Sequence, residues 1–536
     1  MQQQLHTLLH DILSDSYRGS LSISLYETCT VLASSLPSDL KQRLLDYAGQ
    51  PDYLNILVQS QNADGSWRED NRLFYLPDAL ISTTAAVLAL LTNDTVPIND
   101  PIIQKATDFI SQNSLSALMM DDMKKTIGFE SLLVANINRL MGMGLSFDLD
   151  AAVLSKLNMV RDMKLQKKLA HLYDANLTIH SVLDAFADKS SEIDWERLSE
   201  FQESNGSMGI YASSTVQLLE NLDSSSASYQ QGVDYLFDCA GTTGFTPFSP
   251  SDQFEIWWAL YMLGDSPLSD EVAAVVQTIA DIPDDGIAVT NSFSLADVDT
   301  TAMKIAALQF LGHEVNISPI HSFFDGQAYQ CYRFENRLSV SANIHALVAL
   351  SGSLDYRDEI EDEPYRKFMS SLNYVLDELQ NNQFEDKWHL SNLYTTCHTM
   401  EFFVNLIDSS IFHLLPEATR EVIFNSLQGM AEYAYSTYDG QGGFGEQNQS
   451  TVEETAYVTS ALIKTTRVLD IVLERDLLIA IQHYLNTHTP EMDIPLWLGK
   501  TLYKSRVITE AAKLSALAWI EHYLNLAQAS QQAIAS

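Results

Sequence analysis

Two carboxyl groups and two hydroxyl groups lie close together in the segment DVDTT, residues 297–301. Protonation of a carbon–carbon double bond requires a carboxyl that still holds its proton at neutral pH. A carboxyl reaches that state when it is removed from water and lies beside a second carboxylate. Asp297 could provide that carboxylate for Asp299, and the hydroxyls of Thr300 and Thr301 could fix the geometry by hydrogen bonds. The spacing therefore predicts that Asp299 is a general acid.

The same residues also fit an ordinary helix start, because acids and hydroxyls are favoured at the N-cap and in the first turn. Apolar residues then recur three and four positions apart at Met303, Ala306, Ala307 and Phe310, which predicts a helix. The two interpretations are compatible, since a helix start is a good mount for a catalytic acid.

A carbocation formed by this acid would need a cavity lined by aromatic rings and poor in water. Any one aromatic residue is more often plain core than part of such a lining. The candidates are Trp257, Trp258, Phe334, Trp388 and Tyr394.

The composition limits the possible partners. The chain has 536 residues, which suggests two or more domains, and 31 Lys and Arg against 70 Asp and Glu give a net charge of -39. That charge argues against nucleic acid and anionic membranes as partners. An anionic substrate would need a local basic cluster or a bound cation.

Targeting and redox signals point to a cytoplasmic protein. The N-terminal segment MQQQLHTLLHDILSD has no cationic flank before an apolar run, so we expect no signal peptide. No apolar stretch of about 20 residues predicts a membrane span. The four scattered cysteines form no CxxC pair and are expected to be reduced thiols. The motifs HExxH and the P-loop are missing.

The elements that must position these residues are mainly helical. Glycine-rich turns at 62–67, 204–209 and 439–445 separate helical stretches and resemble a loose repeat. Repeated helix pairs suggest stacked or ring-closed α-α units, although each turn alone also fits an ordinary interhelical connection. The segment 242–250, rich in Gly, Pro and Thr, is a candidate domain boundary.

The segment 297–302, DVDTTA, resembles the DxDTTA form of the acid motif of class II terpene cyclases. The likeness is to bacterial diterpene cyclases of the kolavenyl, halimadienyl and copalyl diphosphate synthase type. Further matching segments follow in family order at 24–28 (SLYET), 64–67 (DGSW), 127–130 (IGFE), 161–165 (RDMKL), 341–347 (SANIHAL) and 386–389 (DKWH).

This resemblance implies an all-α fold of two α/α-barrel domains, called β and γ, with the active site between them. Residues 1–17 and 245–536 are then expected to form the β domain, which carries the acid motif. Residues 18–244 are expected to form the inserted γ domain, which contributes diphosphate and Mg²⁺ binding.

The resemblance also implies roles for single residues. Asp299 corresponds to the general acid, and Asn343 to an Asn that orients it directly or through water. Glu130 and Lys164 correspond to positions tied to Mg²⁺ and diphosphate. Basic neighbours in sequence, of which Lys125 and Arg161 are the main candidates, would complete the diphosphate site; Trp258 and Trp388 are expected to contact substrate. Without the family, these residues fit a solvated helix face or a satisfied core amide.

His180 matches a His that, paired with an Asn, deprotonates the cation in plant copalyl diphosphate synthases. The Asn position falls at Thr246 or Pro247 here. A cation that is not deprotonated early can rearrange, so the resemblance favours a halimadane or clerodane skeleton such as kolavenyl diphosphate. The chain lacks DDxxD, the motif with which class I synthases ionise a diphosphate. The product should therefore keep its diphosphate and pass to a class I terpene synthase or a phosphatase.

Alternatives stay open. The substrate could be geranylgeranyl diphosphate, giving a rearranged or a copalyl product, or farnesyl diphosphate, giving drimenyl diphosphate. A triterpene cyclase of the squalene-hopene type fits less well, because that family has more QW repeats and a DxDD motif. A non-enzymatic α/α-toroid scaffold would not need two buried acids before an apolar helix.

Overall fold

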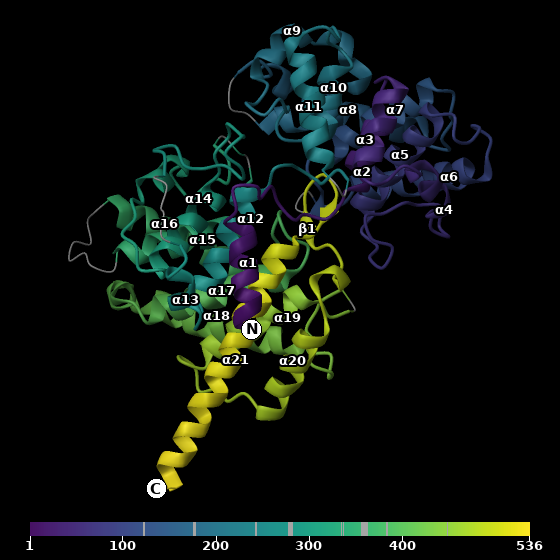
Figure 1. Cartoon of the computed structure of the whole chain (residues 1–536). Coiled ribbons are helices and arrows are strands. Elements are labelled where there is room, and N and C mark those ends of the chain that lie inside the picture. The colour runs from purple at the N-terminus through teal and green to yellow at the C-terminus, as the bar shows by residue number, and fades with distance from the viewer. Residues whose placement is uncertain are drawn as a thin grey trace.

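The computed structural model describes residues 1–121, 124–174, 178–241, 244–276, 282–333, 335, 337–354, 363–381, 384–447 and 449–535. Helices dominate these residues, and they form two barrels joined side by side (Figure 1). This confirms the expected all-α architecture. Across the described residues, no helix is long and apolar enough to cross a membrane.

The larger barrel has a closed inner ring of helices. Each helix packs against the next, and the last packs against the first. Most residues of the ring helices are buried, apart from the C-terminal half of α21, so these helices lack a single apolar stripe. In ring order they are α12 (Asp252–Gly264), α14 (Val298–Phe310), α15 (Val340–Leu354), α17 (Asn392–Ile407), α19 (Val452–Thr465) and α21 (Arg506–Ala535).

Shorter or more amphipathic helices cover this ring from outside. They are α13 (Ser269–Ala273), α16 (Glu363–Gln380), α18 (Glu417–Ser436), α20 (Arg475–Thr487) and the 3-10 turns η4 (Ser318–Phe323), η5 (Ser410–Leu414) and η6 (Pro490–Met492).

The smaller barrel repeats the plan with a second closed inner ring. Its members are α2 (Leu25–Leu32), α5 (Leu76–Thr92), α7 (Phe129–Gly142), the 3-10 segment η2 (Thr178–Glu192) and α10 (Ala212–Leu219). Its other helices are α3 (Ser38–Tyr47), α4 (Tyr53–Gln59), α6 (Pro101–Leu118), α8 (Ala151–Leu169), α9 (Trp195–Leu198), η3 (Ser199–Phe201) and α11 (Ala227–Ala240).

The first helix, α1 (Gln2–Ile12), lies against α21 in the larger barrel, whereas α2, the next helix in sequence, belongs to the smaller barrel (Figure 1). Its apolar face joins the larger core, as does Tyr17. At the return crossing, Phe245 packs in the smaller barrel and Phe248 in the larger. The smaller barrel is thus inserted between α1 and α12.

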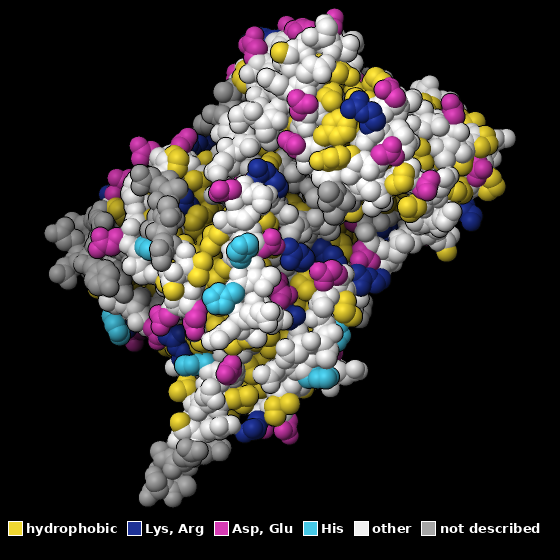
Figure 2. Space-filling model, viewed as in Figure 1, with side chains coloured by type: hydrophobic (Ala, Val, Ile, Leu, Met, Phe, Trp, Pro, Cys, Tyr) yellow, Lys and Arg dark blue, Asp and Glu magenta, His cyan; other side chains and the backbone are white. Residues whose placement is uncertain are grey.

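A short hairpin connects the two barrels. Strands β1 (Trp497–Leu498) and β2 (Leu502–Tyr503) pair antiparallel, and their leucines pack with Leu73 and Tyr75 of the smaller barrel. The backbone N–H of Ile127 donates to the carbonyl of Gly499 in the hairpin turn at 2.8 Å. On the face in Figure 2, several Lys and Arg side chains lie near this junction.

Candidate active site

The acid motif forms the start of α14, in the inner ring of the larger barrel. Asp297 is the N-cap, and its carboxylate accepts from the backbone N–H of Thr300 at 2.6 Å. The Thr301 hydroxyl donates to the Asp297 carbonyl at 2.6 Å and accepts from the Ile287 N–H at 2.9 Å. The ordinary helix-start interpretation is therefore correct, and it places Asp299 in the first helical turn.

Asp299 has a partner that sequence reasoning missed. Nδ1 of His345, on α15, lies 2.5 Å from its Oδ1. His345 is 0% exposed and Asp299 7% exposed. The other carboxylate oxygen of Asp299, Oδ2, accepts no hydrogen bond from the described residues. A buried carboxyl with one oxygen held by an imidazole and the other available is suited to transferring a proton.

Asp297 does not supply the expected negative charge. Burial raises its pKa to about 8, with nearby Asp299 adding to the rise and bonds from Thr300 opposing it. Asp297 is therefore largely protonated at neutral pH. Its Oδ2 and the Thr300 hydroxyl have no hydrogen-bond partner within the described chain.

Asn343 makes no direct hydrogen bond with the acid in this structure, so its expected orienting role stays a prediction. Its Oδ1 accepts from the Tyr329 N–H and the Ser371 hydroxyl, both at 2.8 Å. Its Nδ2 donates to the carbonyls of Tyr329 at 2.9 Å and Ser339 at 2.8 Å. These four bonds use the whole capacity of the amide. Residues two apart on a helix point about 200° apart, so Asn343 cannot share the direction of His345.

Aromatic rings surround the Asp299–His345 pair. The indole of Trp258 stands edge-on to His345 at 5.7 Å and lies 4.6 Å from Phe254. Tyr394 lies 6.2 Å from His345 and 5.2 Å from Trp497. Of the aromatic residues proposed from the sequence, Trp258 and Tyr394 therefore lie beside the acid and its histidine partner.

The other aromatic candidates lie differently. Trp388 is half-buried and packs 6.2 Å from Tyr332, and its indole N–H has no partner among the described residues. The ammonium group of Lys304 lies 5.0 Å from the centre of the Trp257 ring. Phe334 lies outside the described residues.

The smaller barrel brings three of the expected diphosphate and metal residues together. The ammonium groups of Lys125 and Lys164 both lie 2.9 Å from Oε1 of Glu130, at the start of α7. Burial alone would raise the pKa of Glu130, but the two lysines outweigh it and hold the pKa below its ordinary value. Glu130 is therefore ionised, with a surplus of positive charge around it.

The cluster of Glu130, Lys125 and Lys164 offers one carboxylate as a ligand for Mg²⁺. Mg²⁺ commonly takes one or two carboxylates together with the phosphate oxygens of a substrate. No group of three or more His, Cys, Asp or Glu side chains that could hold an ion occurs within the described ranges. Glu130 could thus hold Mg²⁺ as a ligand shared with a diphosphate.

Arg161 does not join this cluster. Its guanidinium is 1% exposed and forms a forked ion pair with Asp188, one arm of which measures 2.7 Å. Nearby on α8, burial lowers the pKa of Lys168, and Lys167 is exposed. Lys124 lies 2.8 Å from Glu385 of the larger barrel.

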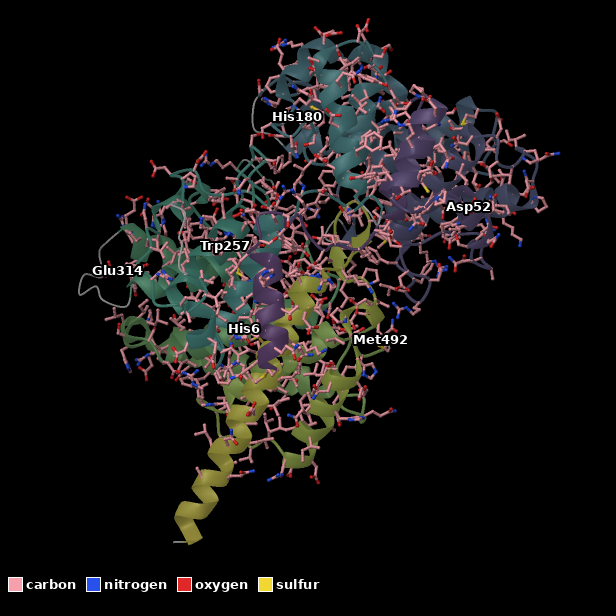
Figure 3. All side chains as sticks on the ribbon, in the orientation of Figure 1. His6, Asp52, His180, Trp257, Glu314 and Met492 are labelled. Carbon is pink, nitrogen blue, oxygen red and sulfur yellow. The ribbon has the colours of Figure 1, made fainter. Side chains whose placement is uncertain are left out.

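His180 lies in the smaller barrel, and Trp257 in the larger (Figure 3). Nε2 of His180 donates to the carbonyl of Leu172 at 2.7 Å, and the ring packs 5.3 Å from Phe201. Burial lowers the pKa of His180, so the ring is neutral with Nδ1 unprotonated. The Thr246 hydroxyl donates to the Phe248 carbonyl at 3.0 Å, and neither it nor Pro247 makes a hydrogen bond with His180.

Sequence reasoning also missed a buried ion cluster where the barrels meet. The ammonium of Lys500, in the hairpin turn, lies 3.0 Å from Asp184, 2.6 Å from the Ser213 hydroxyl and 3.7 Å from Glu27. The Tyr26 hydroxyl donates to Asp184 at 2.6 Å. Lys500 is 2% exposed, so these contacts replace its hydration.

Sequence comparisons find relatives that are named diterpene cyclases or copalyl diphosphate synthases. A type B diterpene cyclase of Mycobacterium tuberculosis is 27% identical over 486 residues, 87% of this chain and 91% of the relative. Copalyl diphosphate synthase 1 of Selaginella moellendorffii is 26% identical over 400 residues, 72% of this chain and 51% of the relative. The chain thus spans nearly all of the bacterial relative and about half of the plant one. No protein-family model matches the chain.

Two solved structures share the fold. The ent-copalyl diphosphate synthase from Streptomyces platensis superposes with a TM-score of 0.72 at 23% identity, over 97% of this chain and 99% of that one. The ent-copalyl diphosphate synthase from Arabidopsis thaliana, in complex with (S)-15-aza-14,15-dihydrogeranylgeranyl thiolodiphosphate, superposes with a TM-score of 0.62 at 19% identity. The match covers 96% of this chain and 63% of that one.

Proposed function

We propose that this chain, whose relatives and fold are those of class II diterpene cyclases, converts geranylgeranyl diphosphate into a bicyclic diterpenyl diphosphate. The first step is protonation of the terminal double bond by Asp299. The observation that carries the proposal is the buried contact between Asp299 and His345, which aromatic side chains of the larger barrel surround.

The geometry assigns a role to each oxygen of the acid. Oδ1 stays hydrogen-bonded to His345, and the proton leaves from Oδ2. The π electrons of the alkene form the new C–H bond, and the positive charge develops on the adjacent tertiary carbon. Two further double bonds attack in turn to close the rings. The rings of Trp258 and Tyr394, which lie beside the pair, would stabilise the positive charge.

The diphosphate is held at the other end of the substrate. Lys125 and Lys164 would neutralise its oxygens, and Glu130 would hold a Mg²⁺ ion shared with them. Mg²⁺, when bound, offsets the diphosphate charge. Because this acidic chain carries a net charge of -39, such local neutralisation is necessary. The diphosphate is not cleaved, so the overall reaction is an isomerisation.

For the product, we propose a rearranged clerodane or halimadane skeleton, such as kolavenyl diphosphate. His180 has Leu172 as its hydrogen-bond partner, and Pro247 offers no side-chain acceptor beside it. Without a paired base, hydride and methyl shifts compete with early deprotonation. Direct copalyl formation is the alternative, and farnesyl diphosphate is the alternative substrate. A class I synthase or a phosphatase would use the product, in the cytoplasm.

Incubation with C15, C20 and C30 substrates, followed by phosphatase treatment, mass spectrometry and NMR, tests this proposal. We expect a bicyclic alcohol from the C20 substrate and none of it with Asp299→Asn. An unrearranged labdane with an exocyclic methylene would contradict the product proposal alone. Lack of turnover with all three substrates would contradict the function and favour a scaffold.

A further inference from the structure

A second histidine lies directly behind His345. Nδ1 of His398, on α17, is 3.2 Å from Nε2 of His345. The His398 ring is packed against Tyr394 at 4.5 Å, Tyr457 at 5.4 Å and Tyr261 at 6.2 Å. Its side chain therefore cannot turn away, and Asp299, His345 and His398 form one buried chain of hydrogen-bonding groups.

The far nitrogen of His398 is unusual. It has no hydrogen-bond partner among the described residues, although His398 is only 2% exposed. His398 lines a small cavity of about 20 Å³, room for one water molecule. Polar groups from the inner helices α17 and α19 and from the end of α12 also line it: Asp265, Glu401, Tyr457, Ser460 and Lys464.

Charges in this cavity are paired. Lys464 lies 2.7 Å from Asp265 and 2.9 Å from Glu401. Burial would lower the pKa of Lys464, but these two carboxylates raise it above its usual value, so Lys464 is a cation. Burial, with a contribution from His345, lowers the pKa of His398 well below its ordinary value. His398 is therefore neutral and carries a single N–H.

The position of that N–H decides which atom is the donor in each hydrogen bond between His398, His345 and Asp299. If Nδ1 of His398 holds it and the Asp299–His345 pair shares no net charge transfer, this group donates to Nε2 of His345, and Nδ1 of His345 donates to Oδ1 of Asp299. The acidic proton of Asp299 is then on Oδ2. If Nε2 of His398 holds it instead, each bond reverses, and the proton of Asp299 points at His345 and cannot reach a substrate.

We infer that His398 is a positioning residue: its Nδ1–H tautomer holds the transferable proton of Asp299 on the oxygen that faces away from His345. This inference rests on the proposed function for its catalytic meaning. The cation Lys464 lines the same cavity as His398 and disfavours added positive charge on its ring, which favours an Nε2 without a proton. His398 then donates at Nδ1.

Two substitutions at His398 separate its hydrogen bond from its packing. Asn places an N–H near the position of Nδ1 and leaves out Nε2, whereas Phe keeps the ring and removes both nitrogens. His398→Phe is expected to lower kcat roughly 10- to 100-fold with KM little changed, as expected for a misplaced proton donor. His398→Asn should recover most of that loss. Melting curves and binding of an aza analogue of the substrate check that both variants are folded.

An independent measurement does not need activity. In protein labelled with ¹⁵N-histidine, the shifts of the two ring nitrogens report which one carries the proton, and His345→Gln and His398→Asn assign the signals. We expect Nδ1–H tautomers in both His345 and His398. A proton on Nε2 of His398, or full kcat in His398→Phe, would overturn the inference. If wild type cyclised no prenyl diphosphate, the proposed function would fail while the tautomer result still stood.

Discussion

The ammonium group of Lys500 lies 3.0 Å from Oδ2 of Asp184, although the two residues belong to different barrels. A buried ion pair contributes little net stability when intact, but removal of one partner leaves an uncompensated charge. The hairpin that carries Lys500 is thus fixed in the smaller barrel by a contact that is costly to break.

Lys500→Met should therefore destabilise the protein strongly, by about 3–5 kcal/mol. Asp184 and Glu27 would remain buried without their cation. The matched control is Lys367→Met, which removes an ion pair whose carboxylate partner, Glu363, is 68% exposed and should cost about 1 kcal/mol or less. Urea unfolding of the two variants measures the difference; equal costs would mean that the Lys500 cluster is not tightly buried in solution.

Asp299→Asn should abolish cyclisation and leave the fold intact. The amide is close in shape to the carboxyl and can still accept a hydrogen bond from His345, but it has no acidic proton to give. Product analysis by mass spectrometry, with melting temperature as the folding check, measures the effect. Residual activity above a few per cent would show that another group is the acid.

Asp297 should make the stability of the protein fall as pH rises. Its folded-state pKa of about 8 lies above the ordinary value of 3.8, so between these values the folded state holds a proton that the unfolded state has lost. Stability then declines by up to about 1.4 kcal/mol per pH unit across that window.

Asp297→Asn removes this titration but keeps an N-cap acceptor. The stability of the variant relative to wild type should increase as pH rises from about 5 to about 8, the window set by the raised pKa. Melting temperatures at several pH values measure the difference between the two proteins. A constant difference across that range would contradict a raised pKa at Asp297.

The cluster around Glu130 should control diphosphate and metal dependence. Lys164→Ala should raise KM with a smaller effect on kcat, since it removes charge that binds the diphosphate. Lys167→Ala, an exposed lysine on the same helix, is the control and should change little. Glu130→Ala should weaken the dependence on Mg²⁺, and full turnover of wild type in EDTA would exclude the metal proposal.

Local patterns predicted the helix that carries the acid, because N-cap chemistry at Asp297 and Thr301 and apolar spacing after them depend on neighbours in sequence. They could not predict His345, which lies 46 residues from Asp299 along the chain. The resemblance pointed to Asn343, and a two-residue offset on a helix decides which side chain faces the acid. Lys500 was missed because a lone lysine in a short turn gives no local sign that carboxylates from another barrel surround it.

The packing of α1 on α21 has a consequence for synthesis on the ribosome. The helix–helix contacts that close the smaller barrel's inner ring all join residues 25–219, so this ring can close while more than half of the chain is still to be made. The larger ring closes only when α21 meets α12, and α21 is also the helix against which α1 packs. The apolar face of α1, with Leu5, Leu8, Leu9 and Ile12, therefore lacks its contacts with α21 through most of translation, when a chaperone that binds short apolar helices could protect it.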